Sequence, residues 1–161
     1  VYGLIFLTRS MGFAFNEVVV SFADKPQGLT QLKRFAKVLA VSTMSMLGII
    51  AFTPLGGFWF SNISGLSSNL VELSSLTIMF AILMPGYQVY QSWYGGLLVH
   101  SHETRGISEA VMIYVSLALL GLYLGTHFAS GPGIYWTINV FVISGLSQTF
   151  FLRYRYKRLR I

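Results

Sequence analysis

The stretch FAKVLAVSTMSMLGIIAFTPLGGFWF, residues 35–60, contains a single charged residue, Lys37. Lys33 and Arg34 stand directly before it, whereas residues 61–69, which follow it, carry no charge. An apolar run of about 20 residues is long enough to cross a bilayer as a helix. Only helices or closed barrels can cross, and this run is too uniformly apolar for the alternating strands of a barrel. The stretch therefore predicts a transmembrane helix with one basic end and one neutral end.

The composition of the whole chain agrees with this interpretation. Of its 161 residues, 54% are hydrophobic and 10% are charged, against about 25% charged residues in ordinary soluble domains. The net charge of +6 fits an anionic membrane leaflet better than nucleic acid, because the basic residues stand at the edges of apolar runs. The sequence contains no cysteine, which excludes disulfides, thiolate metal sites and cysteine nucleophiles. We expect an all-α polytopic membrane helix bundle whose partner is the lipid bilayer.

Similar runs recur along the chain and divide it into five predicted spans. They form a single transmembrane domain, residues 1–161, with spans at 1–22, 35–60, 70–99, 107–126 and 134–152 and a basic tail at 153–161. Pro54 and Pro85 lie inside two of these spans. Proline removes a helical hydrogen bond and clashes with the preceding turn, so both positions predict structural kinks.

Lysine and arginine alternate between the gaps and so predict an orientation. The first gap, the third gap and the tail are basic, whereas residues 61–68 and 126–133 contain no Lys or Arg. Because Lys and Arg stay on the cytoplasmic side during insertion, the N-terminus is predicted outside and the tail in the cytoplasm. We expect an integral protein of the plasma (inner) membrane.

Two charged residues and an asparagine interrupt the first span. At about 100° per residue, Arg9 and Asn16 lie nearly on one line, and Glu17 lies roughly a quarter turn away. A charge near the bilayer centre costs about 2.5–3.5 kcal/mol, so such residues usually face a protein interior or a water-filled cavity. The alternative is that Arg9 reaches the interface and Glu17 stabilises a helix pair near the cytoplasmic side.

The third span carries a polar and aromatic stripe after Pro85. Tyr87, Tyr90, Gln91 and Tyr94 recur at i, i+3, i+4 and i+7, which places them on one helix face. Gln88, Ser92, Gly95 and Gly96 lie to one side of this face. The stripe either lines a cavity or packs against neighbouring helices.

The segment His100-Ser101-His102-Glu103 does not predict a metal site. Two histidines at i and i+2 point apart on a helix, and the sequence offers no evident third ligand. It contains no phosphate-binding glycine loop, catalytic serine motif or HExxH motif. We therefore expect no enzymatic activity, no metal and no cofactor.

Three stretches resemble a known transporter superfamily. They are RSMGFAFNEVVV at 9–20, LKRF at 32–35 with TPL at 53–55, and residues 84–99 followed by HETRGI at 102–107. Together they are similar to the multidrug/oligosaccharidyl-lipid/polysaccharide flippase superfamily. That superfamily includes multidrug and toxin extrusion transporters, polysaccharide and lipid-linked precursor flippases, and the progressive ankylosis protein group. The resemblance covers almost the whole chain and is closest to the ankylosis-like branch.

The resemblance implies a fold and a function. Each half of these transporters has six helices and begins in the cytoplasm, so the five spans would correspond to helices two to six of one half. The other half or a second copy would then complete the central cavity. The chain would belong to a secondary-active efflux transporter, antiporter or flippase that moves a small organic solute, organic anion or lipid-linked molecule by alternating access. A proton or sodium ion would be the coupling cation.

The pathway residues expected on this basis are Arg9, Asn16, Glu17, Tyr87, Tyr90, Gln91 and Tyr94. Two alternatives stay open. One is a non-catalytic membrane subunit, and the other is a lipid-modifying membrane enzyme.

Overall fold

The protein is helical in every regular element of the part of the chain that the computed structural model describes, residues 1–25, 28–128 and 131–159. The helices are α1 (Tyr2–Phe22), α2 (Gly28–Phe52), α3 (Pro54–Phe58), the π-helical turn η1 (Trp59–Ile63), α4 (Ser68–Ala81), α5 (Leu83–His100), α6 (Arg105–Phe128) and α7 (Gly133–Leu159). The expectation of an all-α fold is confirmed.

Four helical segments are long and apolar enough to cross a membrane. They are α1, α2, the consecutive helices α4 and α5 over Ser68–His100, and α6. These four segments are compatible with an integral membrane protein. Helix α7, which contains the predicted span 134–152, is not among the four, so the fifth span stays a prediction.

Two helices extend further into polar sequence than the apolar runs indicate. Helix α2 begins at Gly28 rather than near residue 35, and α7 continues to Leu159 through most of the predicted tail. Long cationic side chains can lie along a helix and still reach water. Lys157 and Arg158 also occupy the last turn of α7, where cations interact favourably with the helix dipole. Arg160 and Ile161 of the predicted tail lie outside the described residues, as do residues 26–27 and 129–130 of the predicted loops.

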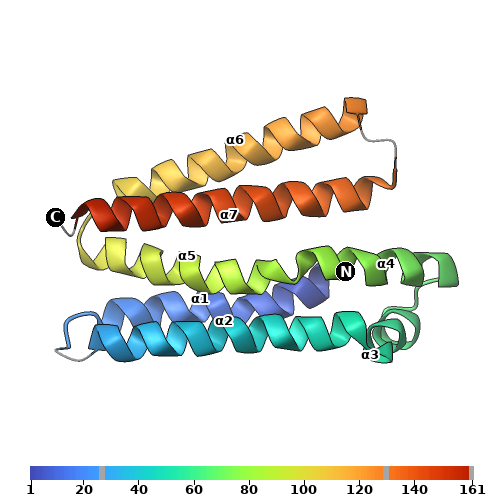
Figure 1. The fold of residues 1–161 in the computed structure, drawn as a ribbon, viewed down its shortest axis with the longest axis horizontal. Helices are drawn as coiled ribbons and strands as arrows, with labels where there is room; N and C mark the ends of the chain where they lie inside the picture. The colour runs from blue at the N-terminus through green and yellow to red at the C-terminus, as the bar shows by residue number, and fades with distance from the viewer. Residues whose placement is uncertain (26–27, 129–130, 160–161) are drawn as a thin grey trace.

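Both prolines coincide with interruptions of a helix. Helix α2 ends at Phe52, Thr53 is extended (φ −116°, ψ 164°), and Pro54 begins α3. Helices α4 and α5 are separated only at Ile82, which keeps helical dihedrals. Pro85 cannot donate the backbone hydrogen bond that would reach back across this junction. The chain bends between α5 and α4 (Figure 1).

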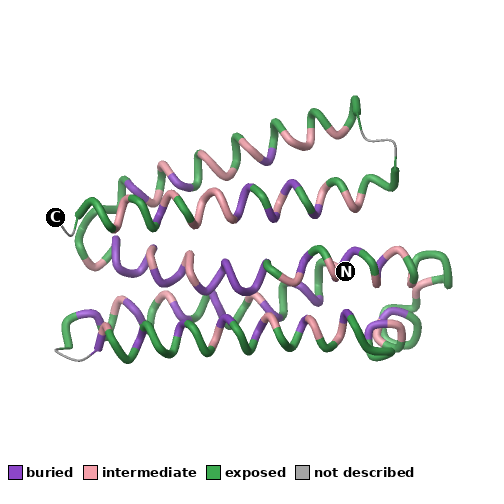
Figure 2. Tube along the Cα trace, in the orientation of Figure 1, coloured by how far each residue is buried: buried purple, intermediate pink, exposed green. Residues whose placement is uncertain are grey.

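Helix α5 lies at the centre of the bundle. Helices α1 and α2 pack on it from one side and α7 from the other, while α6 packs on α7 and hardly contacts α5 (Figure 1). The longest buried stretches of the chain accordingly belong to α5 (Figure 2). Helix α6 buries only Gly106, Ala110 and Ala118.

Glycines allow the helices to approach α5 closely. A Cβ atom on Gly96 of α5 would lie 2.8 Å from Cβ of Val19 on α1, and one on Gly145 of α7 would lie 2.7 Å from the hydroxyl oxygen of Tyr87. In a membrane, lipid tails remove the hydrophobic drive for helix association, so close packing of small residues carries much of it. The glycine contacts therefore fix the positions of α1 and α7 relative to α5.

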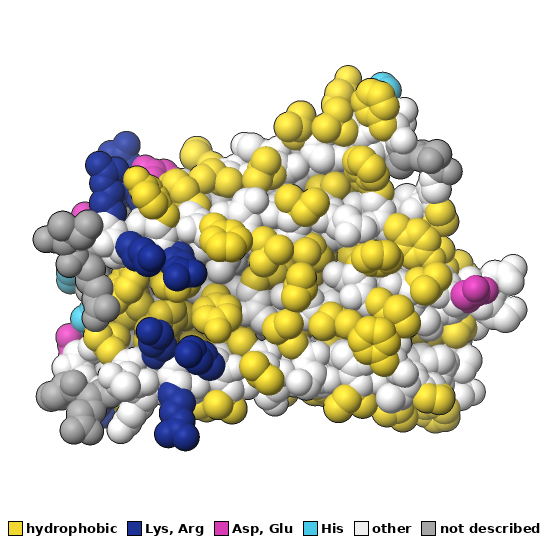
Figure 3. Space-filling model, viewed as in Figure 1, with side chains coloured by type: hydrophobic (Ala, Val, Ile, Leu, Met, Phe, Trp, Pro, Cys, Tyr) yellow, Lys and Arg dark blue, Asp and Glu magenta, His cyan; other side chains and the backbone are white. Residues whose placement is uncertain are grey.

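The basic residues gather at one end of the bundle. The α1–α2 connection, the α5–α6 connection and the C-terminal end of α7 lie at this end (Figure 1), and the visible Lys and Arg side chains cluster there (Figure 3). We call it the basic end. Arg9, in the first half of α1, is the exception to this distribution.

The glycine contacts predict a sharp difference between two alanine substitutions. Gly96→Ala should lower the free energy of unfolding by about 1–3 kcal/mol, because its Cβ would overlap the branched side chain of Val19. Gly48→Ala on α2, where nothing lies within 4 Å of the added Cβ, should be neutral or stabilising because alanine favours the helix. Thermal unfolding of the purified proteins in the same detergent measures both. Equal effects would contradict the close α1–α5 contact.

Candidate functional site

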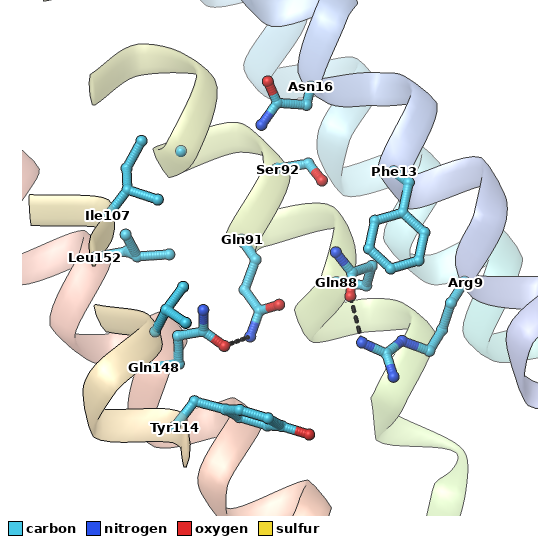
Figure 4. Close-up of a pocket in the computed structure, with 12 residues that line it drawn as sticks. Arg9, Phe13, Asn16, Gln88, Gln91, Ser92, Ile107, Tyr114, Gln148 and Leu152 are labelled. Carbon is cyan, nitrogen blue, oxygen red and sulfur yellow. Dashed lines mark hydrogen bonds between the residues drawn. The ribbon is translucent and has the colours of Figure 1, made fainter. Parts of the chain in front are cut away.

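A groove of about 380 Å³ lies among helices α1, α5, α6 and α7 (Figure 4). We call it the Arg9 groove. Its walls combine polar and apolar side chains from all four helices, namely Arg9, Phe13 and Asn16 of α1; Gln88, Gln91, Ser92 and Gly95 of α5; Ile107, Val111 and Tyr114 of α6; and Gln148 and Leu152 of α7.

Arg9 has only neutral partners in this groove. Its Nη2 donates a hydrogen bond to Oε1 of Gln88 at 2.5 Å. Its Cζ lies 5.6 Å from the ring centroid of Phe13 and 5.7 Å from that of Tyr87, within the range of cation–π attraction. Its Nε is buried without an acceptor in the described part of the chain. Arg9 thus has no neutralising partner in the described part of the chain and keeps one buried donor without an acceptor.

Two acids at the basic end are paired with residues other than Arg9. Glu109 accepts from Nε of Arg105 at 3.1 Å and lies 2.8 Å from Nη2 of Arg155, which joins α6 to α7. Asp24 lies 3.0 Å from Nε2 of His100. Since α6 begins at Arg105, Glu109 lies beyond its first turn and acts through these ion pairs. Among the described residues, no acid is paired with Arg9.

The position of Arg9 along α1 makes its charge costly. At 1.5 Å per residue, α1 is about 30 Å long and Arg9 lies about 10 Å from its first residue. If α1 crosses the bilayer, the guanidinium lies inside the hydrocarbon region, where an arginine costs about 2.5–3.5 kcal/mol. An anionic group in the groove would offset this cost.

Polar groups on the remaining walls supply hydrogen bonds. Nε2 of Gln91 donates to Oε1 of Gln148 and to the carbonyl oxygen of Gly145, each at 3.0 Å, and so bridges α5 to α7. The Arg9–Gln88 pair faces this bridge across the groove (Figure 4). The side chains of Asn16, Ser92 and Tyr114 form no hydrogen bond within residues 1–25, 28–128 and 131–159. They are available to a polar solute.

Three of the predicted pathway residues meet at this groove. Arg9, Asn16 and Gln91 line it, as the sequence pattern indicates for a polar cavity. Glu17 does not line it and is exposed on α1.

The three predicted tyrosines lie elsewhere on α5. Tyr87 is 4% exposed, packs in the core near Gly145 and directs its hydroxyl to the carbonyl oxygen of Phe141 at 3.4 Å. Tyr90 is half-buried against a second core cluster. Tyr94 lines a different groove, between α2 and α7.

The polar stripe of α5 is displaced by one residue from the predicted one. Gln88, Gln91, Ser92 and Gly95 line the groove, and they too follow the spacing i, i+3, i+4 and i+7. The face that lines the groove contains both glutamines of α5, whereas the predicted face was chosen from the positions of the three tyrosines. Gln148 lies in the predicted fifth span and lines the groove from α7. Tyr114 could not be identified from the sequence, since its neighbours in α6 are apolar and form no polar stripe with it.

Comparisons with protein-family models, curated proteins and solved structures found no match to this chain. The transporter resemblance therefore depends on the stretches at 9–20, 32–35, 53–55 and 84–107 alone.

The Arg9–Gln88 contact can be tested by a double-mutant cycle. Gln88→Leu should lower the free energy of unfolding by about 1–3 kcal/mol, because it leaves the guanidinium without its acceptor. Arg9→Met combined with Gln88→Leu should recover most of this loss, since an apolar pair has no unmet polar group. Chemical unfolding in detergent provides the measurement. Additive losses would show that the two side chains do not depend on each other.

Proposed function

We propose that the chain forms the transmembrane helices of a transporter or flippase that moves an organic solute with an anionic group. The observation that carries the proposal is the cation of Arg9, which faces a polar groove and has only neutral partners. Arginine is well suited to such a role because its guanidinium is always charged and presents several donors to a carboxylate or phosphate.

The free polar groups favour ligand binding over a purely structural role. A network that only joins helices is expected to satisfy its buried donors, since an unsatisfied one costs about 1–3 kcal/mol. Here Nε of Arg9 lacks an acceptor, and Asn16 and Ser92 add further free groups. The apolar side chains of Ile107, Val111 and Leu152 on the same walls suit a solute that also has an apolar part.

The membrane topology is part of the proposal. We propose that α7 is the fifth span, because it runs beside α6 along the bundle (Figure 1). The clustering of Lys and Arg at the basic end supports a cytoplasmic location for that end. The membrane is then the plasma (inner) membrane, with the N-terminus outside.

Alternating access requires two bodies that move around the solute. The other half of a transporter or a second copy would supply the second body. A proton or sodium ion is proposed as the coupling cation. Glu17 is the acid to test for coupling, because it lies within α1 and has no ion pair among the described residues.

A second candidate is a non-catalytic membrane subunit. Met112, Leu119 and Leu120 on α6 are 70%, 65% and 56% exposed, which leaves an apolar surface that a partner helix can cover. In this case the Arg9 groove would be filled by the partner, and the chain itself would move no solute.

The transport proposal predicts that Arg9→Gln abolishes most uptake. The assay measures uptake of a radiolabelled panel of carboxylates, sulfonates and phosphate monoesters into proteoliposomes. We expect uptake of the transported anion to be at least about 10-fold slower in Arg9→Gln, because a hydrogen bond to a charged group contributes about 1.5–3 kcal/mol. The matched control is Arg34→Gln, which removes an exposed arginine of α2 outside the groove. Uptake that is unchanged in Arg9→Gln would contradict the role of Arg9, and no uptake of any panel member by the wild type would favour the subunit.

The topology can be tested with single cysteines because the sequence contains none. Ser64→Cys and Ser101→Cys place exposed thiols at opposite ends of the bundle. An impermeant maleimide should label Ser64→Cys in intact cells and Ser101→Cys only after permeabilisation. The reverse pattern would invert the proposed orientation, and labelling of both in intact cells would contradict it.

A further inference from the structure

A second groove lies on the other flank of α5, at the basic end. It has a volume of about 430 Å³ and runs between α2 and α7 over α5. Lys33 of α2 and Arg153 and Lys157 of α7 form its walls, and Trp93, Tyr94 and Tyr156 add aromatic surface. We call it the basic groove. Lys and Arg side chains lie on both sides of an apolar strip at this end of the molecule (Figure 3).

The cations of the basic groove have no counter-charge in the described part of the chain. Lys33, Arg153 and Lys157 form no ion pair there, and no acid lines the groove. The nearby acids Asp24 and Glu109 are held by His100 and by Arg105 and Arg155. Three like charges around one hollow repel each other, and an anion between them would relieve this repulsion.

Aromatic side chains form part of the lining of this hollow. Trp93 is 7% exposed and stacks on Phe15 of α1 with ring centroids 6.4 Å apart. Its indole N–H has no acceptor among the described residues. The rings of Tyr94 and Tyr156 contact each other at 6.0 Å. Tryptophan and tyrosine are enriched where the hydrocarbon region meets the headgroups.

We propose that the basic groove binds the phosphate headgroup of an anionic phospholipid from the leaflet at the basic end. Basic pockets between transmembrane helices on the cytoplasmic side are suited to such headgroups. A lipid fits better than a soluble phosphate, because the floor is aromatic and the walls are the ends of helices α2 and α7. The acyl chains would continue along the apolar surface of the bundle.

A bound headgroup would join two parts of the bundle. Helices α2 and α7 each pack on α5 rather than extensively on each other, and the cations that face the groove come from both. A phosphate between Lys33 and the pair Arg153 and Lys157 would link them electrostatically. The proposal concerns the opposite flank of α5 from the Arg9 groove, so it stands or fails independently of solute transport.

The test compares two triple variants that remove the same charge. One is Lys33→Gln, Arg153→Gln and Lys157→Gln in the groove. The control is Lys25→Gln, Arg34→Gln and Arg158→Gln, at the same end but outside it. Binding of phosphatidylglycerol and phosphatidylcholine to the purified protein is measured by native mass spectrometry, and thermal stabilisation by each lipid is measured in mixed micelles. Glycerol phosphate and inorganic phosphate serve as soluble probes.

We expect the wild type and the control triple to prefer phosphatidylglycerol. The groove triple should bind it on the order of 100-fold more weakly, at about fivefold for each cation removed. If both triple variants lost the same affinity for phosphatidylglycerol, the binding would be diffuse electrostatic attraction, and the proposed site would be wrong. Stabilisation by inorganic phosphate or glycerol phosphate equal to that by the lipid would overturn the lipid as ligand. A wild type without preference for the anionic lipid would overturn the proposal as a whole.

Discussion

Close backbone approach to helix α5 is the constraint on which the rest of the structure depends. Gly96 admits Val19 of α1, and Gly145 of α7 admits the ring of Tyr87. In lipid such contacts carry much of the association energy, so they set where α1 and α7 stand. Both grooves lie beside α5, one among α1, α5, α6 and α7 and the other between α2 and α7.

The same packing determines the surroundings of the Arg9 guanidinium. Close contact between α1 and α5 brings Gln88 within reach of the guanidinium and places Phe13 and Tyr87 near it. These partners lower the cost of the charge but do not neutralise it. A structural arginine would gain more from a carboxylate, and the neighbouring ion pairs at the basic end show that the chain uses carboxylates where it joins helices. The neutral surroundings of Arg9 are therefore the basis of the proposal that it binds an anion reversibly.

Much of the fold could be predicted from the sequence, because apolar length and charge placement are local properties. The helices α1, α2, α4 with α5, and α6 follow from them directly. The start of α2 and the end of α7 could not be predicted, since helices continue into polar sequence when cationic side chains reach water. At the site, Arg9, Asn16 and Gln91 were predictable as polar residues within spans. The sequence could not show whether the face with Tyr87 or the face with Gln88 lines the groove. This depends on the packing of Gly145 of α7 against Tyr87.

The exposed side of α6 bears on how a solute would reach Arg9. Helix α6 is held by α7 and hardly contacts α5, and α1 and α6 both supply walls of the Arg9 groove without packing extensively on each other. Phe6 and Phe13 of α1 are 60% and 48% exposed, and Met112 of α6 is 70% exposed. Lateral access through apolar side chains suits a solute that enters from the bilayer with its anionic group leading to the guanidinium. A strictly hydrophilic solute would instead need a second body to cover the groove before it could be held there. The balance of apolar and polar walls thus favours an amphiphilic anion.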